Sequence, residues 1–572
     1  MALRAHGGTL INRISSSKRQ KELKKELTNS KLDLTLSQRQ TCDLELLMNG
    51  GFSPLTGFMN KDEYESVLDN MRLPSSDIWP IPVNLDVTRE VAKKLKAGDK
   101  ITLRTEEEVP LAVLTVGDVW KPNKSEEAEK VYGADDETHP AVHYLHHQAH
   151  EYYVGGEIEG LELPHHYDFQ EFRNTPKELR TQFKENGWDK VVAFQTRNPM
   201  HRAHVELAMR ASKETGAKLL IHPAVGMTKP GDVDHYTRVR VYREVIKKFP
   251  ENSAMISLLP LAMRMGGPRE ALWHTIIRKN YGATHFIIGR DHAGPGKNSD
   301  GEDFYGPYEA QELVEEYADE LGMTIVPFRM MVYVPKKDEY HAIDDLAEDE
   351  EHWSISGTEL RGKLASGEEL PNWFTYPEVE RELRKTHKPK HKQGFTVFFT
   401  GLSGSGKSTL ANALMVRLNE LGGRHVTLLD GDIVRKNLSS ELGFSKEHRD
   451  INVKRIGFVA SEIAKNGGVA ICAPIAPYDN VRKEVRDMVF KEGGDFLLVH
   501  VATPLEECEK RDRKGLYAQA RAGKIKNFTG IDDPYEEPKD ADVTFDTTGK
   551  HPSELVDVIV EHIKAHGFYT NS

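Results

Sequence analysis

Apolar positions follow two different patterns along the chain. Between about residues 35 and 165 they form short β-type runs separated by turn residues, as at 79–84, 100–103 and 111–115, without long helical periodicity. From about residue 170, short apolar runs alternate with helical stretches instead. The first pattern predicts a mostly β domain built as a small barrel, and the second predicts an α/β domain with a parallel sheet.

The α/β part contains runs that predict buried strands, at 190–194, 218–222, 284–289 and 324–328. In sheets of this kind, ligands bind beyond the carboxyl ends of the strands. The loops that follow these runs are therefore the places where chemistry is expected.

A glycine-rich segment follows another apolar run later in the chain. Residues 395–400, FTVFFT, predict a buried strand, and GLSGSGKST follows at once, with a helix expected from Ser408. In this context glycines let backbone N–H groups surround phosphate oxygens, the lysine reaches the β- and γ-phosphates, and the serine holds Mg²⁺. The predicted contacts are Gly401, Gly404, Gly406, Lys407 and Ser408.

Length, charge and cysteine usage limit the class of protein. A chain of 572 residues is too long for one core and predicts several domains. The net charge of −12 argues against a general nucleic-acid or acidic-membrane binder, and no apolar run is long enough to span a membrane. Cys42, Cys472 and Cys508 lack C-x-x-C spacing, so we expect neither structural zinc nor disulfides. We therefore expect a reducing compartment, the cytoplasm. The basic, acid-free first residues leave a transit peptide as the alternative.

A polar cluster follows the first α/β strand. Phe194 is followed by QTRNPMHRAH, which leads into a helix. His201 and His204 lie on one helical face near its N-terminus, where two imidazoles can donate hydrogen bonds to a phosphate in a transition state. Arg197 offers a planar fork suited to a tetrahedral oxyanion. A zinc-binding pair and two structural histidines are the alternatives.

A second cluster, GRDHAGPG at 289–296, follows the strand predicted at 284–289. Its glycines permit close backbone approach, while Arg290 and His292 supply charge and hydrogen-bond donors. The loops MTKPGD and MRMGGPR, at 227–232 and 263–269, add glycine and basic residues beside the same sheet. Turn formation alone is the alternative for these loops.

Two smaller features concern a helix start and a histidine-rich stretch. The segment ISGTELR at 355–361 predicts a helix capped by Ser356 or Thr358. The histidine-rich stretch indicates a polar surface of the β domain, with a zinc hydrolase as the alternative. Its histidines are His139, His143, His146, His147 and His150.

Taken in order, these motifs resemble the ATP sulfurylase (sulfate adenylyltransferase) family. The matching segments are NGGFSPLTGFM, QTRNPMHRAH, MRMGGPRE, GRDHAGPG and ISGTELR, so the resemblance covers about residues 1–393. It implies an N-terminal PUA-like β domain at 1–168, a nucleotidyltransferase (Rossmann-like) α/β domain at 169–330, and a small third domain with a linker at 331–393. The implied reaction converts ATP and sulfate to adenylyl sulfate (APS) and pyrophosphate, with Mg²⁺ accompanying ATP and no metal held by the protein.

The resemblance also implies roles for individual residues. The catalytic set would be Thr196, Arg197, Asn198, His201 and His204, with the two histidines steadying the transition state. Sulfate would be bound by Gln195, Arg197 and the Ala293 backbone, and Phe328 would be a conformational switch. The ATP-binding set would be Gln195, Thr196, Arg197, Asn198, Gly289, Arg290, Asp291, His292 and Met331.

The C-terminal part contains more than its glycine-rich loop. Asp432 follows the strand expected at 425–429 and is placed to assist Mg²⁺ or a substrate hydroxyl, and Arg435 is placed to bind an anion. With LGFS, RDIN, RDRKGLY and KNFTGIDDPY in order, residues 394–572 resemble APS kinase, which phosphorylates the 3′-hydroxyl of APS to give PAPS. The implied APS and PAPS contacts are Asp432, Ile433, Val434, Arg435, Phe444, Arg449, Asn452, Ile475, Ala476, Lys514 and Phe528.

This part departs from the kinase pattern in two positions. Ile433 stands where those kinases often have Asn, and Ala476 stands where they often have a phosphorylatable Ser, although Arg482 matches. In filamentous-fungal ATP sulfurylases of the same domain order, this domain is an allosteric PAPS site on a hexamer and its glycine-rich loop is typically degraded. Here that loop is intact. The resemblance implies a homohexameric enzyme of sulfate assimilation toward cysteine and methionine that PAPS regulates. An active APS kinase domain, which the intact loop favours, is the alternative.

Overall fold

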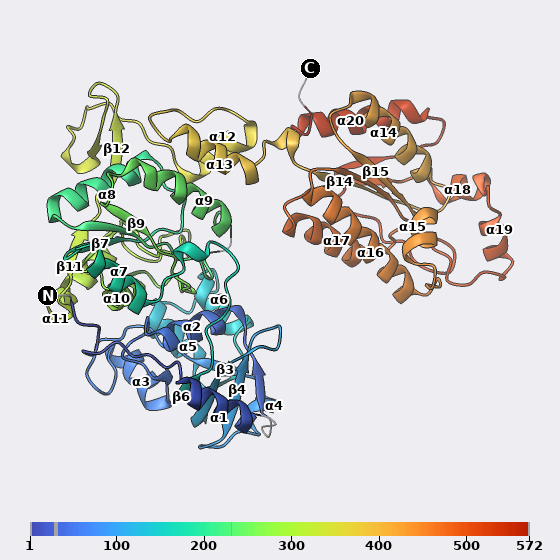
Figure 1. Cartoon of the computed structure of the whole chain (residues 1–572). Helices are drawn as coiled ribbons and strands as arrows, with labels where there is room; N and C mark the ends of the chain where they lie inside the picture. The colour runs from blue at the N-terminus through green and yellow to red at the C-terminus, as the bar shows by residue number, and fades with distance from the viewer. Residues whose placement is uncertain (1–2, 28–31, 230, 570–572) are drawn as a thin grey trace. The chain divides into compact units, whose positions relative to one another are not determined.

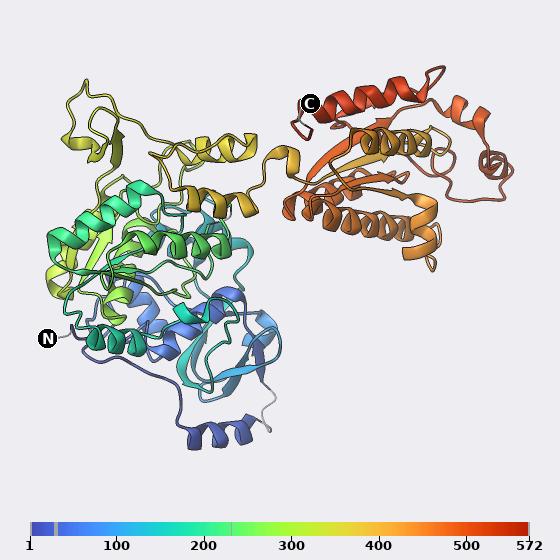
Figure 2. The same ribbon diagram turned by 45° about the horizontal axis from the view of Figure 1, so that its top comes forward.

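The chain forms two compact units, shown in Figure 1 and, after a turn of 45°, in Figure 2. The computed structural model describes residues 3–27, 32–229 and 231–569, with only the backbone at Asp432. Unit 1 comprises residues 1–355 and 371–383, and unit 2 comprises residues 356–370 and 384–572.

The N-terminal part of unit 1 contains a six-stranded sheet with strand order β1-β4-β5-β6-β2, in which β3 also pairs with β6. The runs predicted at 100–103 and 111–115 are β4 and β5, so these strands are confirmed. The strands are β1 (Asp33–Thr35), β2 (Gly57–Phe58), β3 (Leu85–Val87), β4 (Lys100–Arg104), β5 (Pro110–Trp120) and β6 (Tyr152–Gly160). The helices are α1 (Ser17–Leu27), α2 (Gln38–Asn49), α3 (Lys61–Asn70), α4 (Arg89–Ala92), α5 (Lys124–Tyr132) and α6 (Pro140–His147).

The run at 79–84 forms no strand, so that prediction is wrong. Its apolar side chains are buried, but Pro80 and Pro82 lack the backbone N–H that a ladder needs. The helices of this part were also not visible as helical periodicity. In α2, even Gln40, Asp43 and Glu45 are buried, so the helix has no polar face for a sequence pattern to reveal.

The second sheet of unit 1 is parallel, with strand order β11-β10-β7-β8-β9. The four strands predicted in this part are confirmed, and the three-residue strand β9 was missed. The strands are β7 (Val191–Phe194), β8 (Lys218–Ile221), β9 (Ala254–Ile256), β10 (His285–Ile288) and β11 (Thr324–Pro327). The helices around it are α7 (Pro176–Glu185), α8 (Arg202–Thr215), α9 (His235–Val245), α10 (Gly267–Asn280) and α11 (Glu309–Leu321), with short 3₁₀ turns at Gln170–Phe172 and Ile246–Lys248.

An antiparallel hairpin of β12 (Met331–Val334) and β13 (Glu339–Ala342) follows β11. A 3₁₀ turn at Ile343–Asp345 comes next, and helix α13 (Pro377–Thr386) follows later in the chain. Phe374 and Thr375, just before α13, return to the neighbourhood of α8. The sheet and this later segment therefore meet at the start of α8.

A single hydrophobic core runs through both sheets of unit 1, and a buried ion pair lies within it. Arg264 Nη2 lies 2.5 Å from Asp43 Oδ2, and their side chains are 1% and 2% exposed. Burial raises the pKa of Asp43, while the Arg264 and Arg39 cations oppose that rise. The pair joins α2 of the first sheet region to the loop before α10.

Unit 2 is built on a parallel sheet with strand order β15-β16-β14-β17-β18. Val397 and Phe399 of β14 pack into a core with α14 and α20, and Phe398 packs on the other side with α16 and α17, so helices cover both faces. The strands are β14 (Phe395–Thr400), β15 (Val426–Asp430), β16 (Val469–Ala473), β17 (Asp495–Val501) and β18 (Val543–Phe545). The helices are α12 (Gly357–Ser366), α14 (Lys407–Leu421), α15 (Gly431–Leu438), α16 (Lys446–Lys465), α17 (Asp479–Lys491), α18 (Leu505–Arg511), α19 (Leu516–Arg521) and α20 (Pro552–Ala565), with a 3₁₀ turn at Lys390–Lys392.

Several local predictions are confirmed in unit 2. The strand predicted at 395–400 is β14, and α14 begins at Lys407, one residue before the predicted start. Ser356 caps α12, because its side chain accepts a hydrogen bond from the Glu359 N–H at 3.1 Å. In the part of the chain that the structure describes, no helix combines the length and apolar character needed to cross a bilayer.

Removal of the buried carboxylate should destabilise unit 1. In Asp43→Ala, Arg264 stays buried without its ion-pair partner, so we expect the free energy of unfolding of unit 1 to fall by about 3–5 kcal/mol. All six tryptophans lie in unit 1, so urea unfolding followed by tryptophan fluorescence reports on this unit alone. As a control, Asp33→Ala removes a 47% exposed partner of Arg104 and should cost less than about 1 kcal/mol. Equal losses in the two variants would contradict the assigned role.

Candidate active site

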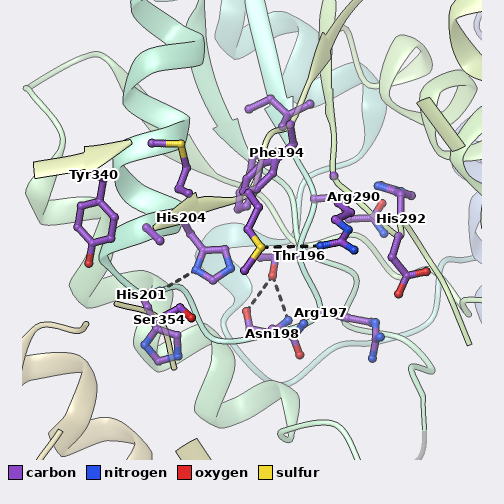
Figure 3. A pocket seen from close by; sticks show the side chains of 18 of the residues that line it. Phe194, Thr196, Arg197, Asn198, His201, His204, Arg290, His292, Tyr340 and Ser354 are labelled. Atoms are coloured by element: carbon purple, nitrogen blue, oxygen red, sulfur yellow. Dashed lines mark hydrogen bonds between the residues drawn. The ribbon is translucent and has the colours of Figure 1, made fainter. Parts of the chain in front are cut away.

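A cavity of about 380 Å³ opens at the carboxyl ends of β7 and β10 (Figure 3). Every residue of the central site that the sequence analysis singled out lines this cavity. They are Gln195, Thr196, Arg197, Asn198, His201, His204, Gly289, Arg290, Asp291, His292, Ala293, Phe328 and Met331.

The loop after β7 is held by its own hydrogen bonds. Thr196 Oγ1 donates to the Asn198 carbonyl at 2.9 Å and accepts from the Asn198 N–H at 3.0 Å. Tyr242 of α9 donates its O–H to the same carbonyl at 2.8 Å. These bonds fix the turn between Gln195 and the start of α8, so the side chains on either side of it enter the cavity in set directions.

Arg197 is the cation nearest the middle of this loop. Its Nη1 lies 2.5 Å from Asp232 Oδ1, with the side chains 22% and 11% exposed. The Asp232 carboxylate also accepts from the Lys229 N–H at 3.1 Å. The ion pair uses one edge of the guanidinium, and the planar fork keeps further N–H donors for an anion in the cavity.

Gln195 is oriented by what surrounds its amide. Its Oε1 is buried and has no hydrogen-bond partner among the described residues, while its Nε2 lies 4.0 Å from Met263 Sδ. Sulfate offers only hydrogen-bond acceptors, so the NH₂ group is the part of this amide that can bind it.

His201 and His204 begin α8, as predicted. The His201 N–H donates to His204 Nδ1 at 3.1 Å, so the neutral His204 ring has its proton on Nε2. His201 Nδ1 lies 2.9 Å from Thr375 Oγ1, and its ring stacks on Phe374 with centroids 4.4 Å apart. Burial lowers the pKa of His204 to about 4, and burial with the neighbouring His204 ring lowers the pKa of His201 to about 3. Both rings are therefore neutral donors at physiological pH.

The loop after β10 presents its backbone to the cavity. Asp291 and Ala293 have φ values of 52° and 55°, in the left-handed region. The Asp291 carbonyl accepts from the Gly294 N–H at 3.1 Å, and the Ala293 carbonyl accepts from the Gly267 N–H at 3.2 Å. The Ala293 N–H has no partner among the described residues, and Ala293 lines the cavity.

Sequence reasoning missed an aromatic part of the cavity wall. These side chains come from segments beyond residue 330, far from the two loops in sequence, and no motif tied them to the site. A signal existed in two tryptophans, which occur only six times in the chain. The wall consists of Tyr340, Trp353, Trp373 and Phe374.

The zinc alternatives require several ligand atoms close enough together to hold one metal ion. Among the described residues, one group of potential metal ligands has donor atoms within 4.8 Å of one another: the exposed residues Glu137, His143 and His147. His201 and His204 are not in it. His139 is buried and bonds to Tyr305, so the prediction of a polar surface is wrong for this histidine.

The glycine-rich loop of unit 2 has the backbone expected of a phosphate-binding loop. Gly401, Gly404 and Gly406 have φ values of 147°, 76° and 108°, which other residues rarely adopt. Lys407 is buried and its Nζ donates to the Leu402 carbonyl at 2.7 Å. Burial lowers the pKa of Lys407 to about 8.

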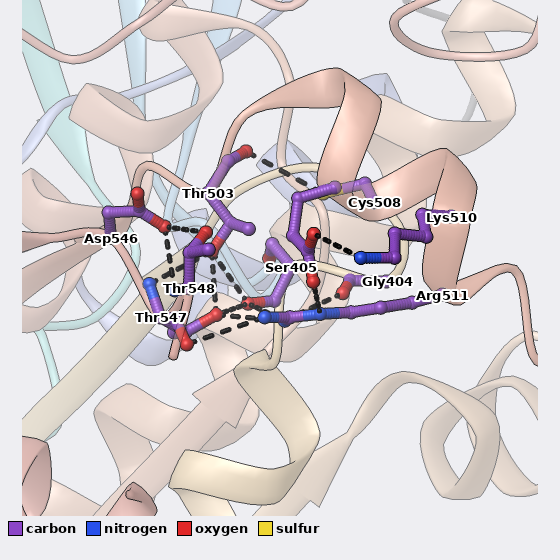
Figure 4. Close-up of polar contacts among 10 residues, drawn as sticks. Gly404, Ser405, Thr503, Cys508, Lys510, Arg511, Asp546, Thr547 and Thr548 are labelled. Carbon is purple, nitrogen blue, oxygen red and sulfur yellow. Dashed lines mark hydrogen bonds and ion pairs between the residues drawn. The ribbon is translucent and has the colours of Figure 1, made fainter. Parts of the chain in front are cut away.

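Arg511 contacts the backbone of this loop, a role that the sequence analysis did not assign (Figure 4). Its Nη1 donates to Thr547 Oγ1 at 2.8 Å and approaches the carbonyls of Gly404 and Ser405. The Ser405 carbonyl also accepts from the hydroxyls of Thr503 and Thr547, each at 2.9 Å. The guanidinium therefore helps to fix the loop.

Among the residues predicted to contact APS or PAPS, two arginines have defined contacts in unit 2. Arg449 bonds to Asp533 at 2.6 Å, Tyr478 at 3.0 Å and Thr529 at 2.8 Å, three partners that the sequence analysis did not single out as site residues. Arg435 lies over the Phe444 ring at 4.2 Å, and Phe444 is 68% exposed.

The other predicted positions of this site differ in exposure. Val434 and Ala476 are buried, Ile433 is 54% exposed, and Phe528 packs against Tyr517. Asn452 is buried with its Oδ1 unpaired among the described residues. The Ile475 carbonyl accepts from Thr400, and Lys514 lies in the turn before α19. The side chain of Asp432 lies outside the described part of the structure.

Comparisons with known proteins agree with this architecture. Three family models match: a PUA-like domain over residues 3–163, ATP-sulfurylase over residues 170–386, and adenylylsulphate kinase over residues 393–546. Relatives named sulfate adenylyltransferase from Phaeosphaeria nodorum and Neurospora crassa are 55% and 54% identical, covering 100% and 98% of this chain and the same shares of their own. A solved structure described as a hexameric APS kinase from Thiobacillus denitrificans is 36% identical over 100% of both chains, with a TM-score of 0.82. The resemblance seen in the motifs is thereby confirmed, and the chain belongs to the sulfate adenylyltransferase family, as a member with a C-terminal adenylylsulphate kinase-like domain.

Proposed function

We propose that the cavity of unit 1 transfers the adenylyl group of Mg-ATP to sulfate, giving APS and pyrophosphate. The observation that supports this most directly is that two loops distant in sequence, together with Met331 of β12, bring all the residues implied for sulfate, ATP and the transition state into one cavity of about 380 Å³. Mg²⁺ enters with the triphosphate as part of the substrate.

The reaction needs positioning rather than proton abstraction. Sulfate is a weak nucleophile that is already ionised, so no general base is required, but two anions must be held together. Arg197, the Ala293 N–H and the Gln195 NH₂ group supply donors for sulfate. Gly289, Arg290, Asp291, His292 and Met331 line the same cavity and are the residues proposed to hold ATP. A sulfate oxygen then attacks the α-phosphorus in line, and pyrophosphate leaves.

The two histidines stabilise the charge that develops at the α-phosphate. The His204 tautomer set by the His201 N–H leaves Nε2–H as a donor. Because burial keeps both rings neutral, they donate hydrogen bonds without adding a full charge to the empty cavity. Thr196 and Asn198 act by fixing the loop, and Phe328 adjusts the nucleotide side as a conformational switch.

We propose that unit 2 binds PAPS and regulates the first unit, within a homohexamer in the cytoplasm. Ile433 and Ala476 depart from the kinase pattern, and the full-length fungal relatives are named for sulfate adenylylation. The hexameric description of the T. denitrificans protein supports the oligomer, and three buried unpaired cysteines fit a reducing compartment. Regulation requires that PAPS bind two states of the assembly with different affinities.

An active APS kinase is the second candidate for unit 2. The intact loop with Lys407, Ser408 and the Arg511 support favours it, as does the name of the T. denitrificans structure. Since APS is a high-energy mixed anhydride, a kinase that consumes it would draw the uphill first reaction forward.

Replacing Arg197 tests the sulfate site. In Arg197→Ala the cavity loses its planar donor fork, and we expect APS synthesis to fall by about 100-fold or more. Pyrophosphate release from Mg-ATP and sulfate measures this. Arg243→Ala, on an exposed position of α9, serves as control and should retain activity. PAPS binding by unit 2 should be unaffected in Arg197→Ala. Survival of APS synthesis in this variant would show that the sulfate site is misplaced.

The pH dependence tests the histidine assignment. Since both pKa values lie near 3 and 4, the rings do not titrate between about pH 6 and pH 9, and kcat/KM should show no inflection from them there. His204→Gln should lower kcat by about 100-fold without changing the shape of the profile in this range. An inflection near neutral pH that disappears in the variant would mean that a histidine acts by proton transfer instead.

Purified protein supplied with APS and Mg-ATP distinguishes the two roles of unit 2. The regulator predicts no PAPS or ADP, together with sigmoidal inhibition of APS synthesis by added PAPS. In Lys407→Ala we expect the PAPS concentration for half inhibition to rise by about 10-fold, since a charged hydrogen bond to phosphate is lost. The control is Lys454→Ala, on α16, where the lysine side chain is 44% exposed and pairs with Glu484. PAPS and ADP that are formed by the wild type and lost in Lys407→Ala would establish the kinase.

A further inference from the structure

A buried chain of side chains leads from α10 into the cavity, and the proposed chemistry does not use it. Glu270 and His274 lie one turn apart on α10, and both are completely buried. His274 Nε2 lies 3.1 Å from Glu270 Oε1, and His274 Nδ1 lies 3.0 Å from His292 Nε2. His292 lines the cavity, so the chain Glu270–His274–His292 ends at the ligand site.

Glu270 is the fixed acceptor at the inner end. Its Oε1 also accepts from the Arg264 N–H at 2.9 Å, and its Oε2 accepts from the Gly266 N–H at 2.8 Å. Each carboxylate oxygen thus accepts a hydrogen bond from a backbone N–H, an arrangement that favours the ionised carboxylate. An ionised carboxylate with these bonds can only accept, and His274 must therefore present Nε2–H to it.

The Glu270 carboxylate determines which nitrogen of each histidine ring carries the proton. With its proton on Nε2, neutral His274 has a bare Nδ1 that accepts from His292. His292 must then have its proton on Nε2, which leaves its Nδ1 as a lone pair. A second proton on His274 would reverse this polarity. Burial with the Arg278 and Arg264 cations opposes that proton and outweighs the Glu270 carboxylate, which favours it, so the pKa of His274 lies below its usual value. Burial, with the Arg278 and Arg197 cations, also lowers the pKa of His292 and keeps that ring neutral.

The lone pair on His292 is open to a ligand. Nδ1 has no hydrogen-bond partner among the described residues, and this atom is not fully buried. It therefore faces accessible space where His292 lines the cavity. Phosphate and sulfate oxygens bring no proton to such an acceptor at neutral pH, whereas the ribose hydroxyls and the adenine amine do.

We propose that Glu270 and His274 are positioning residues of the nucleotide site: they hold His292 in the Nε2–H tautomer, so that Nδ1 accepts a hydrogen bond from an O–H or N–H donor of the bound nucleoside. This rests on the proposed binding of ATP in the cavity. His292 thus recognises the nucleoside of ATP, while Arg197 and the other donors hold the anionic groups. The carboxylate sets the direction of every hydrogen bond in the chain, although it touches no substrate.

Binding of ATP analogues tests the proposal. The analogues are the magnesium complexes of 2′-deoxy-ATP, 3′-deoxy-ATP and purine riboside triphosphate, each lacking one nucleoside donor. Calorimetry measures the dissociation constant of each complex. The protein carries Lys407→Ala, which reduces nucleotide binding by unit 2. We expect one analogue to bind about 10-fold more weakly than ATP, and this ratio to fall below about threefold in His274→Asn and in His292→Ala.

The control and the contrary outcomes are specific. His285→Asn makes the same substitution on β10 outside the chain of bonds and should keep the full ratio. A merely structural role for His274 would weaken ATP and all analogues alike, leaving the ratio unchanged, and that result would overturn the proposal. Equal binding of ATP and all three analogues by the parent protein would also overturn the proposal. This outcome needs no variant, so the test remains decisive even if His274→Asn misfolds. Failure to bind ATP at all would refute the proposed function as well.

Discussion

Parallel pairing of β7 with β10 is the constraint on which the site depends. Phe194 and Ile287 are register partners, so both strands end at the same edge of the sheet. The loops that follow, 195–204 and 289–296, start side by side although about ninety residues separate them in the chain. Neither loop makes a site alone. One offers side-chain cations and imidazoles, and the other offers backbone N–H groups in left-handed conformations.

Beneath that edge, the interior of unit 1 is unusually polar for a protein core. Asp43, Arg264, Glu270 and Arg278 are buried together with His274. Buried ionic groups contribute little net stability compared with well-packed apolar residues, but removing one partner is costly. Glu270, which bonds to His274, is the one of these groups proposed to fix how a cavity histidine donates and accepts. Through it, the core would set the polarity of the cavity as well as its shape.

The sequence allowed the site to be predicted where the chemistry lies in contiguous motifs, and failed where it depends on distant segments. QTRNPMHRAH and GRDHAGPG follow strands that the apolar pattern shows clearly, so their convergence at one sheet edge was predictable. Tyr340, Trp353, Trp373 and Phe374 reach the cavity through tertiary packing that no local pattern encodes. Arg511 has the same limitation, because a single arginine gives no sign that carbonyl oxygens of a glycine loop surround it. Helix α2 escaped detection for the opposite reason, since burial on nearly all sides removes the alternation that identifies a helix.

Gly294 has no side chain, makes no contact through one, and would be passed over in any survey of functional groups. A Cβ atom added there would meet Asp291 Oδ1 at 1.8 Å. Asp291 lines the cavity, so its carboxylate would have to swing away from its present position. In a collection of natural variants, an alanine at this position would look conservative and yet displace a side chain that lines the cavity. Anyone interpreting alleles of this gene should count Gly294 with the residues whose side chains the cavity displays.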